Sequence, residues 1–147
     1  MYNNHELKVK RLSELATMPT RSYDDDVGLD LYLATNASVS VRGHELIILE
    51  FDISVELPQG TWGMLMGRSS TGSERRLLVL PGMLDPGYRG KLSAVIFNLS
   101  PQTQTIEPQA RVAQLIISIH PGKLNVVEVE ELNPSARGEA GFGSTGR

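Results

Sequence analysis

The longest nearly apolar stretch of the chain is Val112-Ala113-Gln114-Leu115-Ile116-Ile117-Ser118-Ile119, and the turn signal His120-Pro121-Gly122 follows it directly. Its β-branched residues favour a strand, and Leu115-Ile116-Ile117 offers no polar face, which indicates burial on both sides. A membrane-spanning helix needs about 20 apolar residues, so this stretch is far too short to cross a bilayer. We therefore predict a buried strand here.

Other short runs of β-branched and apolar residues are spread along the chain, among 14 glycines and 8 prolines. Turn sequences such as Leu57-Pro58-Gln59-Gly60 and Asp85-Pro86-Gly87 separate these runs at short intervals. No stretch of a dozen residues has helical periodicity, and a short helix is allowed only between Ser70 and Leu77. The pattern predicts an all-β fold, a jelly-roll-like β-barrel or sandwich.

The runs define nine predicted strands. Two of them alternate in polarity, Leu7-Lys8-Val9-Lys10 and Val127-Glu128-Val129-Glu130, which indicates one face in water. Val95-Ile96-Phe97 does not alternate and is typical of a buried strand. The predicted strands are residues 6–12, 29–34, 37–41, 46–57, 61–66, 77–80, 91–99, 112–119 and 126–132.

Length and charge limit the possible functions. The 147 residues fit one domain with a sizeable core. There are 14 Lys and Arg residues against 17 Asp and Glu residues, a net charge of −3, and this balance argues against a nucleic-acid partner. The absence of cysteine excludes disulfides, thiolate zinc sites and thiol nucleophiles, and the three histidines match no metal-ligand spacing. A small phosphorylated ligand remains compatible with this composition.

The two ends of the chain differ from its middle. The first residues, Met1-Tyr2-Asn3-Asn4-His5-Glu6, are too polar for a signal peptide, so we expect a soluble, intracellular, cytoplasmic protein with no membrane partner. Residues 134–147 contain four glycines and one large apolar side chain, Phe142, which is too little to sustain order alone. This composition fits either a frayed terminus or a lid that orders on a ligand.

Two segments combine small and charged residues in ways that suit a ligand. Gly67-Arg68-Ser69-Ser70-Thr71-Gly72 follows a predicted strand, and its backbone N–H groups, hydroxyls and arginine suit an anion, although such segments are often plain turns. In Leu80-Pro81-Gly82-Met83-Leu84-Asp85-Pro86-Gly87-Tyr88-Arg89-Gly90, Asp85 could orient a water as a general base and Tyr88 could face a sugar or base. The competing interpretation is an Asp that opens a Pro-Gly turn.

Two further segments place charge near predicted strands. Asp24-Asp25-Asp26-Val27-Gly28-Leu29-Asp30 suits a hard cation by composition, but a solvated loop explains it equally. Asp30 lies inside an apolar strand, where a carboxylate needs a partner. Arg111 and Gln114 stand at the entry to the buried strand, where they either satisfy core polar groups or pair with Asp30 and the Ser69 loop.

Five segments, in order, resemble the five motifs of the trimeric dUTP diphosphatase (dUTPase) family. Any single motif is unspecific, but the five together cover nearly the whole chain at the family's spacing. They are Val27-Gly28-Leu29-Asp30-Leu31, Gly67-Arg68-Ser69-Ser70, Gly82-Met83-Leu84-Asp85-Pro86-Gly87-Tyr88-Arg89-Gly90, Arg111-Val112-Ala113-Gln114-Leu115-Ile116, and the tail Arg137-Gly138-Glu139-Ala140-Gly141-Phe142-Gly143-Ser144-Thr145-Gly146.

The resemblance implies a homotrimer of jelly-roll subunits that share active sites and hydrolyse dUTP to dUMP and pyrophosphate with Mg²⁺. It implies that Asp85 orients the attacking water and that Tyr88 packs under the deoxyribose and excludes a 2′-hydroxyl. Backbone groups of Gly82, Met83 and Leu84 would read the uracil edge. Such an enzyme limits uracil in DNA and supplies dUMP for dTTP synthesis.

The remaining site residues are also assigned by resemblance. Asp30 and Arg111 would support the neighbouring phosphate-site residues or Mg²⁺-bound water, without any side chain ligating the metal directly. Residues 135–147 would form a flexible lid over the main domain, residues 1–134. The residues expected around the phosphates are Arg68, Ser69, Ser70 and Gln114, and those expected from the lid are Arg137, Phe142, Gly143, Ser144 and Thr145, with Phe142 stacked on uracil.

The chain departs from the family pattern at a few positions. Val79 stands where many members have an Asn that contacts the base, and Asp26 and Ala140 replace an Ala and a Gly. Pro108-Gln109-Ala110 replaces the usual Gly-Asp or Gly-Glu before Arg111. None of these changes removes a catalytic group.

Two other functions remain open from the sequence. A dCTP deaminase has a related fold, but it carries a catalytic Glu where this chain has Ile96, which cannot move protons. A second alternative is a binding or regulatory protein that uses the dUTPase fold as a nucleotide-gated surface, although the chain keeps Asp85 and the tail.

Overall fold

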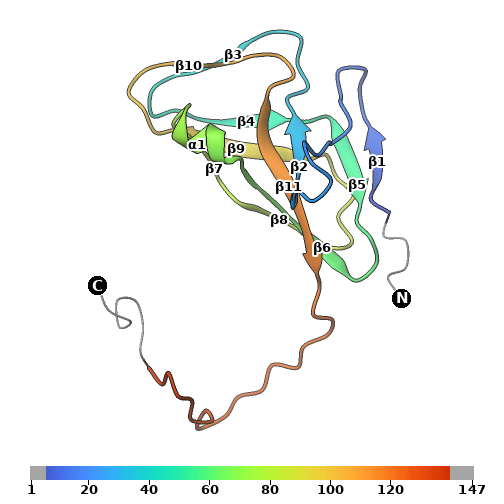
Figure 1. Cartoon of the computed structure of the whole chain (residues 1–147), viewed down its shortest axis with the longest axis vertical. Coiled ribbons are helices and arrows are strands. Elements are labelled where there is room, and N and C mark those ends of the chain that lie inside the picture. Colours follow the sequence, from blue (N-terminus) through green and yellow to red (C-terminus); the bar gives the residue numbers. More distant parts are fainter. Residues whose placement is uncertain (1–5, 140–147) are drawn as a thin grey trace.

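The computed structural model describes residues 6–139, and this part forms eleven strands and one short helix (Figure 1). The bounds of these elements are β1 Lys8–Arg11, β2 Gly28–Tyr32, β3 Val39–Val41, β4 Leu46–Glu50, β5 Ile53–Glu56, β6 Thr61–Gly67, α1 Ser69–Ser73, β7 Leu77–Val79, β8 Gly82–Leu84, β9 Ser93–Asn98, β10 Gln104–Ile106 and β11 Arg111–Ile119. None of the described residues form a helix long and apolar enough to span a bilayer.

The central sheet is built around β11, the stretch that the sequence marks as buried. Its strand order is β2-β11-β6-β8, with antiparallel pairing that sets Leu115 opposite Leu29 on one side and Leu65 on the other. The predicted strand is confirmed, and Val112, Ala113 and Leu115 are fully buried. Burial on both faces is wrong for the second half of the strand, because Ile116 and Ile117 are half-buried and Ile119 is exposed. A register irregularity between Arg111 and Ala113 adjusts the pairing with β2 at the start of β11.

The other strands complete the enclosure of one core. A three-stranded sheet has the order β4-β9-β7, and two-stranded sheets pair β1 with β5 and β10 with β3. Fully buried side chains come from five of these strands and from β2, and they form one apolar cluster. The predicted all-β, jelly-roll-like fold is therefore confirmed, with core residues that include Leu31, Val41, Ile53, Ile96 and Ile106.

The predicted strand 46–57 is in fact two strands. The chain bends at Phe51 and Asp52, where Asp52 takes a φ of 48° and the Phe51 N–H donates to the Leu92 carbonyl at 3.1 Å. β4 then pairs with β9, and β5 pairs with β1. The apolar pattern continues across the bend because both strands face the same core, so hydrophobic periodicity does not reveal the break.

Two short strands and the helix bounds also differ from the prediction. β8 and β10 have three residues each and were not predicted, because glycine in one and polar residues in the other hide their pairing. The predicted short helix exists, but it begins at Ser69 and ends at Ser73. The other predicted strands are present with shifted ends.

The predicted strand 126–132 is wrong. After β11 the described chain runs away from the sandwich (Figure 1), and none of the described strands lies beside it. Val126 is 98% exposed and Leu132 is 86% exposed. Alternating polarity favours a strand only where a partner supplies the backbone hydrogen bonds, and in this chain no described strand supplies them.

Candidate active site

Three charged residues meet at the end of the central sheet. Asp30 lies on β2, Arg111 begins β11, and Arg68 follows the last residue of β6. The Arg68 Nε lies 2.7 Å from Asp30 Oδ1, and Arg111 Nη1 lies 3.1 Å from Asp30 Oδ2. Asp30 is 6% exposed, and its two charge-assisted partners offset the cost of burying a carboxylate.

This cluster has one more positive than negative charge. Arg68 is also fixed through its Nη1, which donates to the Arg111 carbonyl at 3.2 Å. The cluster borders a pocket of about 340 Å³ whose lining includes Asp30, Arg68, Ser69 and Gln114. A polar pocket with preorganised arginine donors is suited to an anionic ligand, because the donors need little reorganisation to bind it.

Gln114 bridges the three strands beside this pocket. On β11 it lies opposite Asp30 of β2 and Met66 of β6, and its Nε2 donates to the Gly67 carbonyl at 3.0 Å. The side-chain amide lies across Gly28, where an added Cβ would overlap the Gln114 Oε1. Gly28 is therefore a glycine because of a close approach, a role that the sequence did not reveal.

One hydroxyl group holds the segment after Arg68 against β11, and a second one bonds within the segment. The buried Thr71 donates through its Oγ1 to the Val112 carbonyl at 3.0 Å, and the Ser73 hydroxyl donates to the Ser69 carbonyl at 3.0 Å. Ser69 is exposed and Ser70 is half-buried. The backbone of the phosphate-site candidates is thus anchored by Thr71, whose role was not predicted.

A second group of candidates lies beside the middle of β6. In β8, Gly82, Met83 and Leu84 pair with Leu65, Met64 and Gly63. Asp85 follows β8 and is exposed, and its carbonyl accepts from the Tyr88 N–H at 3.0 Å in a tight turn. A pocket of about 250 Å³ is bordered by β8, Tyr88 and the residues Lys91, Leu92 and Ser93.

The two groups of candidates are separate within one chain. Leu84, next to Asp85, pairs with Gly63, which is five residues from Arg68 along β6. At about 3.3 Å per strand residue, this separation is roughly 16 Å for Leu84 and roughly 10 Å for Gly82, which pairs with Leu65. The two pockets share no lining residue. The structure therefore forms two separate groups of candidate residues. One group contains Arg68, Ser69 and Gln114 around the polar pocket, and the other, the β8 hairpin, consists of β8 and the turn from Asp85 to Tyr88.

Comparison with known proteins identifies the fold family. The model of the dUTPase family matches residues 14–146. The chain belongs to the dUTPase family. It is 38% identical over 140 residues to a deoxyuridine 5′-triphosphate nucleotidohydrolase of Oryza sativa subsp. japonica, across 95% of this chain and 80% of the relative.

Solved structures resemble this dUTPase-family chain over most of its length. The Staphylococcus bacteriophage 80alpha dUTPase with dUPNHPP has a TM-score of 0.88 and 31% identity, covering 99% of this chain and 100% of that chain. A mutant dUTPase from phage phi11 of S. aureus, in which a structural Mg(II) ion is coordinated, has a TM-score of 0.78 and 27% identity. That match covers 88% of this chain and 99% of that chain.

The tail candidates of this dUTPase-family chain are mostly beyond the described part. Arg137 lies within it and is exposed, whereas Phe142, Gly143, Ser144 and Thr145 lie outside the described residues. Among residues 6–139 no three or more His, Cys, Asp or Glu side chains come together as a metal-binding group. At the deaminase position, Ile96 is fully buried in the core, so a catalytic carboxylate at that position would be buried too.

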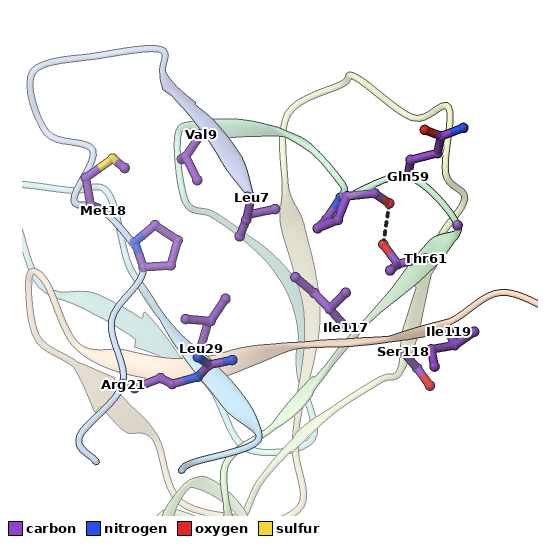
Figure 2. A pocket seen from close by; sticks show the side chains of 13 residues that line it. Leu7, Val9, Met18, Arg21, Leu29, Gln59, Thr61, Ile117, Ser118 and Ile119 are labelled. Atoms are coloured by element: carbon purple, nitrogen blue, oxygen red, sulfur yellow. Dashed lines mark hydrogen bonds between the residues drawn. The ribbon is translucent and has the colours of Figure 1, made fainter. Parts of the chain in front are cut away.

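An apolar groove lies away from all of these candidates. Figure 2 shows it between β1, β2 and the end of β11, with Leu7, Val9, Leu29 and Ile117 pointing into it. Its volume is about 820 Å³, and its lining is mainly apolar. It lacks the convergent polar groups of a catalytic site, and we therefore interpret it as a packing surface.

Proposed function

We propose that this protein hydrolyses dUTP to dUMP and pyrophosphate. The observation that carries the proposal is the pair of prepared half-sites, the Asp30–Arg68–Arg111 cluster and the β8 hairpin, on a dUTPase-family fold. The relative from Oryza sativa bears the name of this activity, and the phage 80alpha dUTPase was solved with dUPNHPP, an analogue of dUTP. The proposed role is to limit uracil in DNA and supply dUMP inside the cell, in the cytoplasm.

In the proposed mechanism, the hairpin half-site binds the nucleoside and supplies the nucleophile. Backbone groups of Gly82, Met83 and Leu84 recognise the uracil edge, and the ring of Tyr88 packs under the deoxyribose. Asp85 is exposed to water, so it has access to the molecule that it orients and deprotonates for attack on the α-phosphorus. Pyrophosphate then leaves without a covalent enzyme intermediate.

In the proposed phosphate half-site, Arg68, Ser69, Ser70 and Gln114 surround the triphosphate. Asp30 acts through Arg68, because it fixes the guanidinium from one side while the Arg111 carbonyl accepts from the same group. Arg111 balances the Asp30 charge. Positioning and charge stabilisation supply most of the catalysis in phosphoryl transfer, so this fixed arrangement is suited to the reaction.

We propose that the phosphate pocket would hold Mg²⁺ together with the triphosphate. Mg²⁺ sites commonly use substrate phosphates, waters and only one or two carboxylates. The described donor set fits that kind of site, because Asp26 and Asp30 border the phosphate pocket without a dedicated metal cage. Asp30 is held by two arginines, so it would support Mg²⁺-bound water and would not ligate the ion directly. The ion supplies neutralisation of phosphate charge when bound.

We propose that residues 135–147 are a lid over the site formed by the main domain, residues 1–134. Arg137, Gly143, Ser144 and Thr145 would contact the phosphates, and Phe142 would stack on the uracil. The support is compositional, because four glycines and one aromatic residue do not sustain order alone but do suit a segment that orders on a ligand.

We propose a homotrimer with shared sites. The separation of the two half-sites along β6 supports a site that takes its halves from different subunits. The apolar groove of Figure 2 and the exposed apolar side chains of residues 124–132 also favour assembly, because large exposed apolar surfaces mark contact sites.

The decisive experiment is to incubate the protein with each dNTP and Mg²⁺ and to identify the products. Formation of dUMP and pyrophosphate from dUTP alone supports the proposal. Release of ammonia from dCTP would instead support a deaminase, and binding without turnover would support a nucleotide-gated binding protein.

A further inference from the structure

We infer that Lys91 is a positioning residue for Tyr88, and that Glu50 and Asp52 hold Lys91 in place. In this arrangement an ion-pair cluster at the edge of the nucleoside pocket, with both of its carboxylates outside the pocket lining, sets how firmly the enzyme discriminates against a 2′-hydroxyl. The inference rests on the proposed function, because it assigns a determinant of sugar choice to the same hairpin.

The side chain of Lys91 is held by two carboxylates. Its Nζ lies 3.0 Å from Glu50 Oε2 and 3.2 Å from Asp52 Oδ1. The hydrogen bond to Glu50 and then that to Asp52 raise the pKa of Lys91 above its usual value, because both carboxylates favour the charged ammonium. Glu50 ends β4 and Asp52 lies at the bend before β5, so the lysine is tied to the β4–β5 junction.

The backbone beside Lys91 is tied to the same junction. The Leu92 N–H donates to the Ile53 carbonyl at 2.8 Å, and the Leu92 carbonyl accepts from the Phe51 N–H at 3.1 Å. Leu92 is 1% exposed and belongs to the core. Side-chain and backbone contacts therefore fix the end of the 85–91 loop against a rigid part of the sandwich.

Tyr88 is fastened to this fixed end. Its hydroxyl donates to the Lys91 carbonyl at 3.0 Å, and its ring lies so close to Gly90 that an added Cβ would overlap the hydroxyl. At the other end, the Tyr88 N–H donates to the Asp85 carbonyl. The ring is thus held across the short loop, and its orientation depends on where the Lys91 carbonyl lies.

These contacts place the Tyr88 ring at the pocket that we propose for the nucleoside. Tyr88 and Lys91 both border the pocket of about 250 Å³ beside β8, whereas Glu50 and Asp52 do not border it. Tyr88 is 45% exposed, so packing alone holds it weakly, and the hydroxyl contact gives it a defined orientation. Loss of the ion pairs of Lys91 with Glu50 and Asp52 should leave the rest of the pocket unchanged and make the Tyr88 ring less ordered.

The test compares Lys91→Met with Lys91→Arg and measures kcat/KM for dUTP and for UTP. We expect the dUTP-to-UTP ratio to fall by about two- to fivefold in Lys91→Met, the range of an exposed ion pair, and to recover in Lys91→Arg. The double variant Glu50→Gln/Asp52→Asn should lower the ratio in the same way. Lys8→Met removes a comparable exposed pair, with Glu56, and is the matched control with an unchanged ratio.

A double-mutant cycle with Tyr88→Phe tests the route of the effect. If Lys91 acts through the tyrosine hydroxyl, Lys91→Met has a smaller effect on the ratio in the Tyr88→Phe background. Equal effects in both backgrounds, or an unchanged ratio in Lys91→Met, would overturn the inference. Ring mobility of isotope-labelled Tyr88, measured by NMR, should rise in Lys91→Met and not in Lys8→Met. This measurement tests the anchor even if the wild-type protein proves inactive on dUTP, which would overturn the proposed function separately.

Discussion

Two glycines in the candidate site make room for functional side chains. Gly28 lies under the amide of Gln114, and Gly90 lies under the ring of Tyr88. The family motifs include both glycines, but composition and spacing do not show which side chain packs against each of them. That information exists only in the register of β2 against β11 and in the fold of the 85–91 loop.

The first prediction concerns Gly28→Ala. The new Cβ overlaps the Gln114 amide, so Gln114 must leave its hydrogen bond to the Gly67 carbonyl. One displaced hydrogen bond is worth about 1 kcal/mol, so kcat/KM for dUTP should fall by about five- to tenfold. Steady-state kinetics checks this. Gly72→Ala is the matched control, because a Cβ there meets nothing within 4 Å. An equal loss in both variants would contradict the explanation.

The second prediction concerns Asp85→Asn. The substitution keeps the shape of the exposed side chain but removes its ability to accept a proton. Turnover should fall by on the order of 10²- to 10⁴-fold while nucleotide affinity changes little. Single-turnover kinetics and titration with dUPNHPP measure the two quantities separately. Near-normal turnover would show that Asp85 is not the group that orients the water.

Charge partners at the residue scale were only partly predictable. The sequence indicates that Asp30 needs a partner, and the structure supplies two, Arg68 and Arg111. Lys91, Glu50 and Asp52 were not identified, because they are common surface residue types far apart in the sequence. Their cluster arises only when the β4–β5 bend lies beside the end of the 85–91 loop.

At the scale of elements, the strands that were wrongly predicted or missed are those whose formation depends on pairing with a neighbouring strand. The buried strand β11 was predictable because its side chains repeat an apolar pattern over a full strand length. β8 and β10 were not, since three residues carry too little periodicity. Segment 126–132 has the right pattern and still forms no strand, because a strand needs a neighbour as well as a pattern.

The third prediction concerns the edge pair of β1 and β5. Lys8 and Glu56 are opposite in the register, and the hydrogen bond from Lys8 lowers the pKa of Glu56 below its ordinary value of 4.5. A carboxyl whose pKa is lower in the folded state adds stability above its unfolded pKa. That stability is lost as the pH falls through the folded pKa. The Tm should therefore fall on acidification below about pH 4.5, and Glu56→Gln should reduce this fall slightly.

Thermal unfolding between about pH 3 and about pH 6 measures the effect. Glu128→Gln, in the exposed segment after β11, is the control and should leave the acid dependence of the wild-type protein unchanged. If the Tm of Glu56→Gln depended on pH as steeply as the Tm of the wild-type protein, the Lys8–Glu56 pair between β1 and β5 would add no pH-dependent stability.

At the scale of the whole molecule, one chain is an incomplete enzyme in our proposal. The fourth prediction is that the 16.1 kDa chain forms an assembly of roughly three times that mass. Light scattering at assay concentration measures the mass. Deleting residues 135–147 should keep this mass and impair hydrolysis, because the lid is lost while the sandwich remains. An active monomer, or a truncated protein with full kcat/KM, would contradict the respective part of the proposal.

The separation of the half-sites along β6 has a genetic consequence. If each site joins the hairpin of one subunit to the arginine cluster of another, two inactive alleles can rescue each other. A chain with a defective hairpin and a chain with a defective arginine cluster would, when expressed together, assemble some sites from two intact halves. Two alleles damaged in the same half would show no such rescue. Complementation in a mixed population would then map each mutation to its half of the site without a structure of the complex.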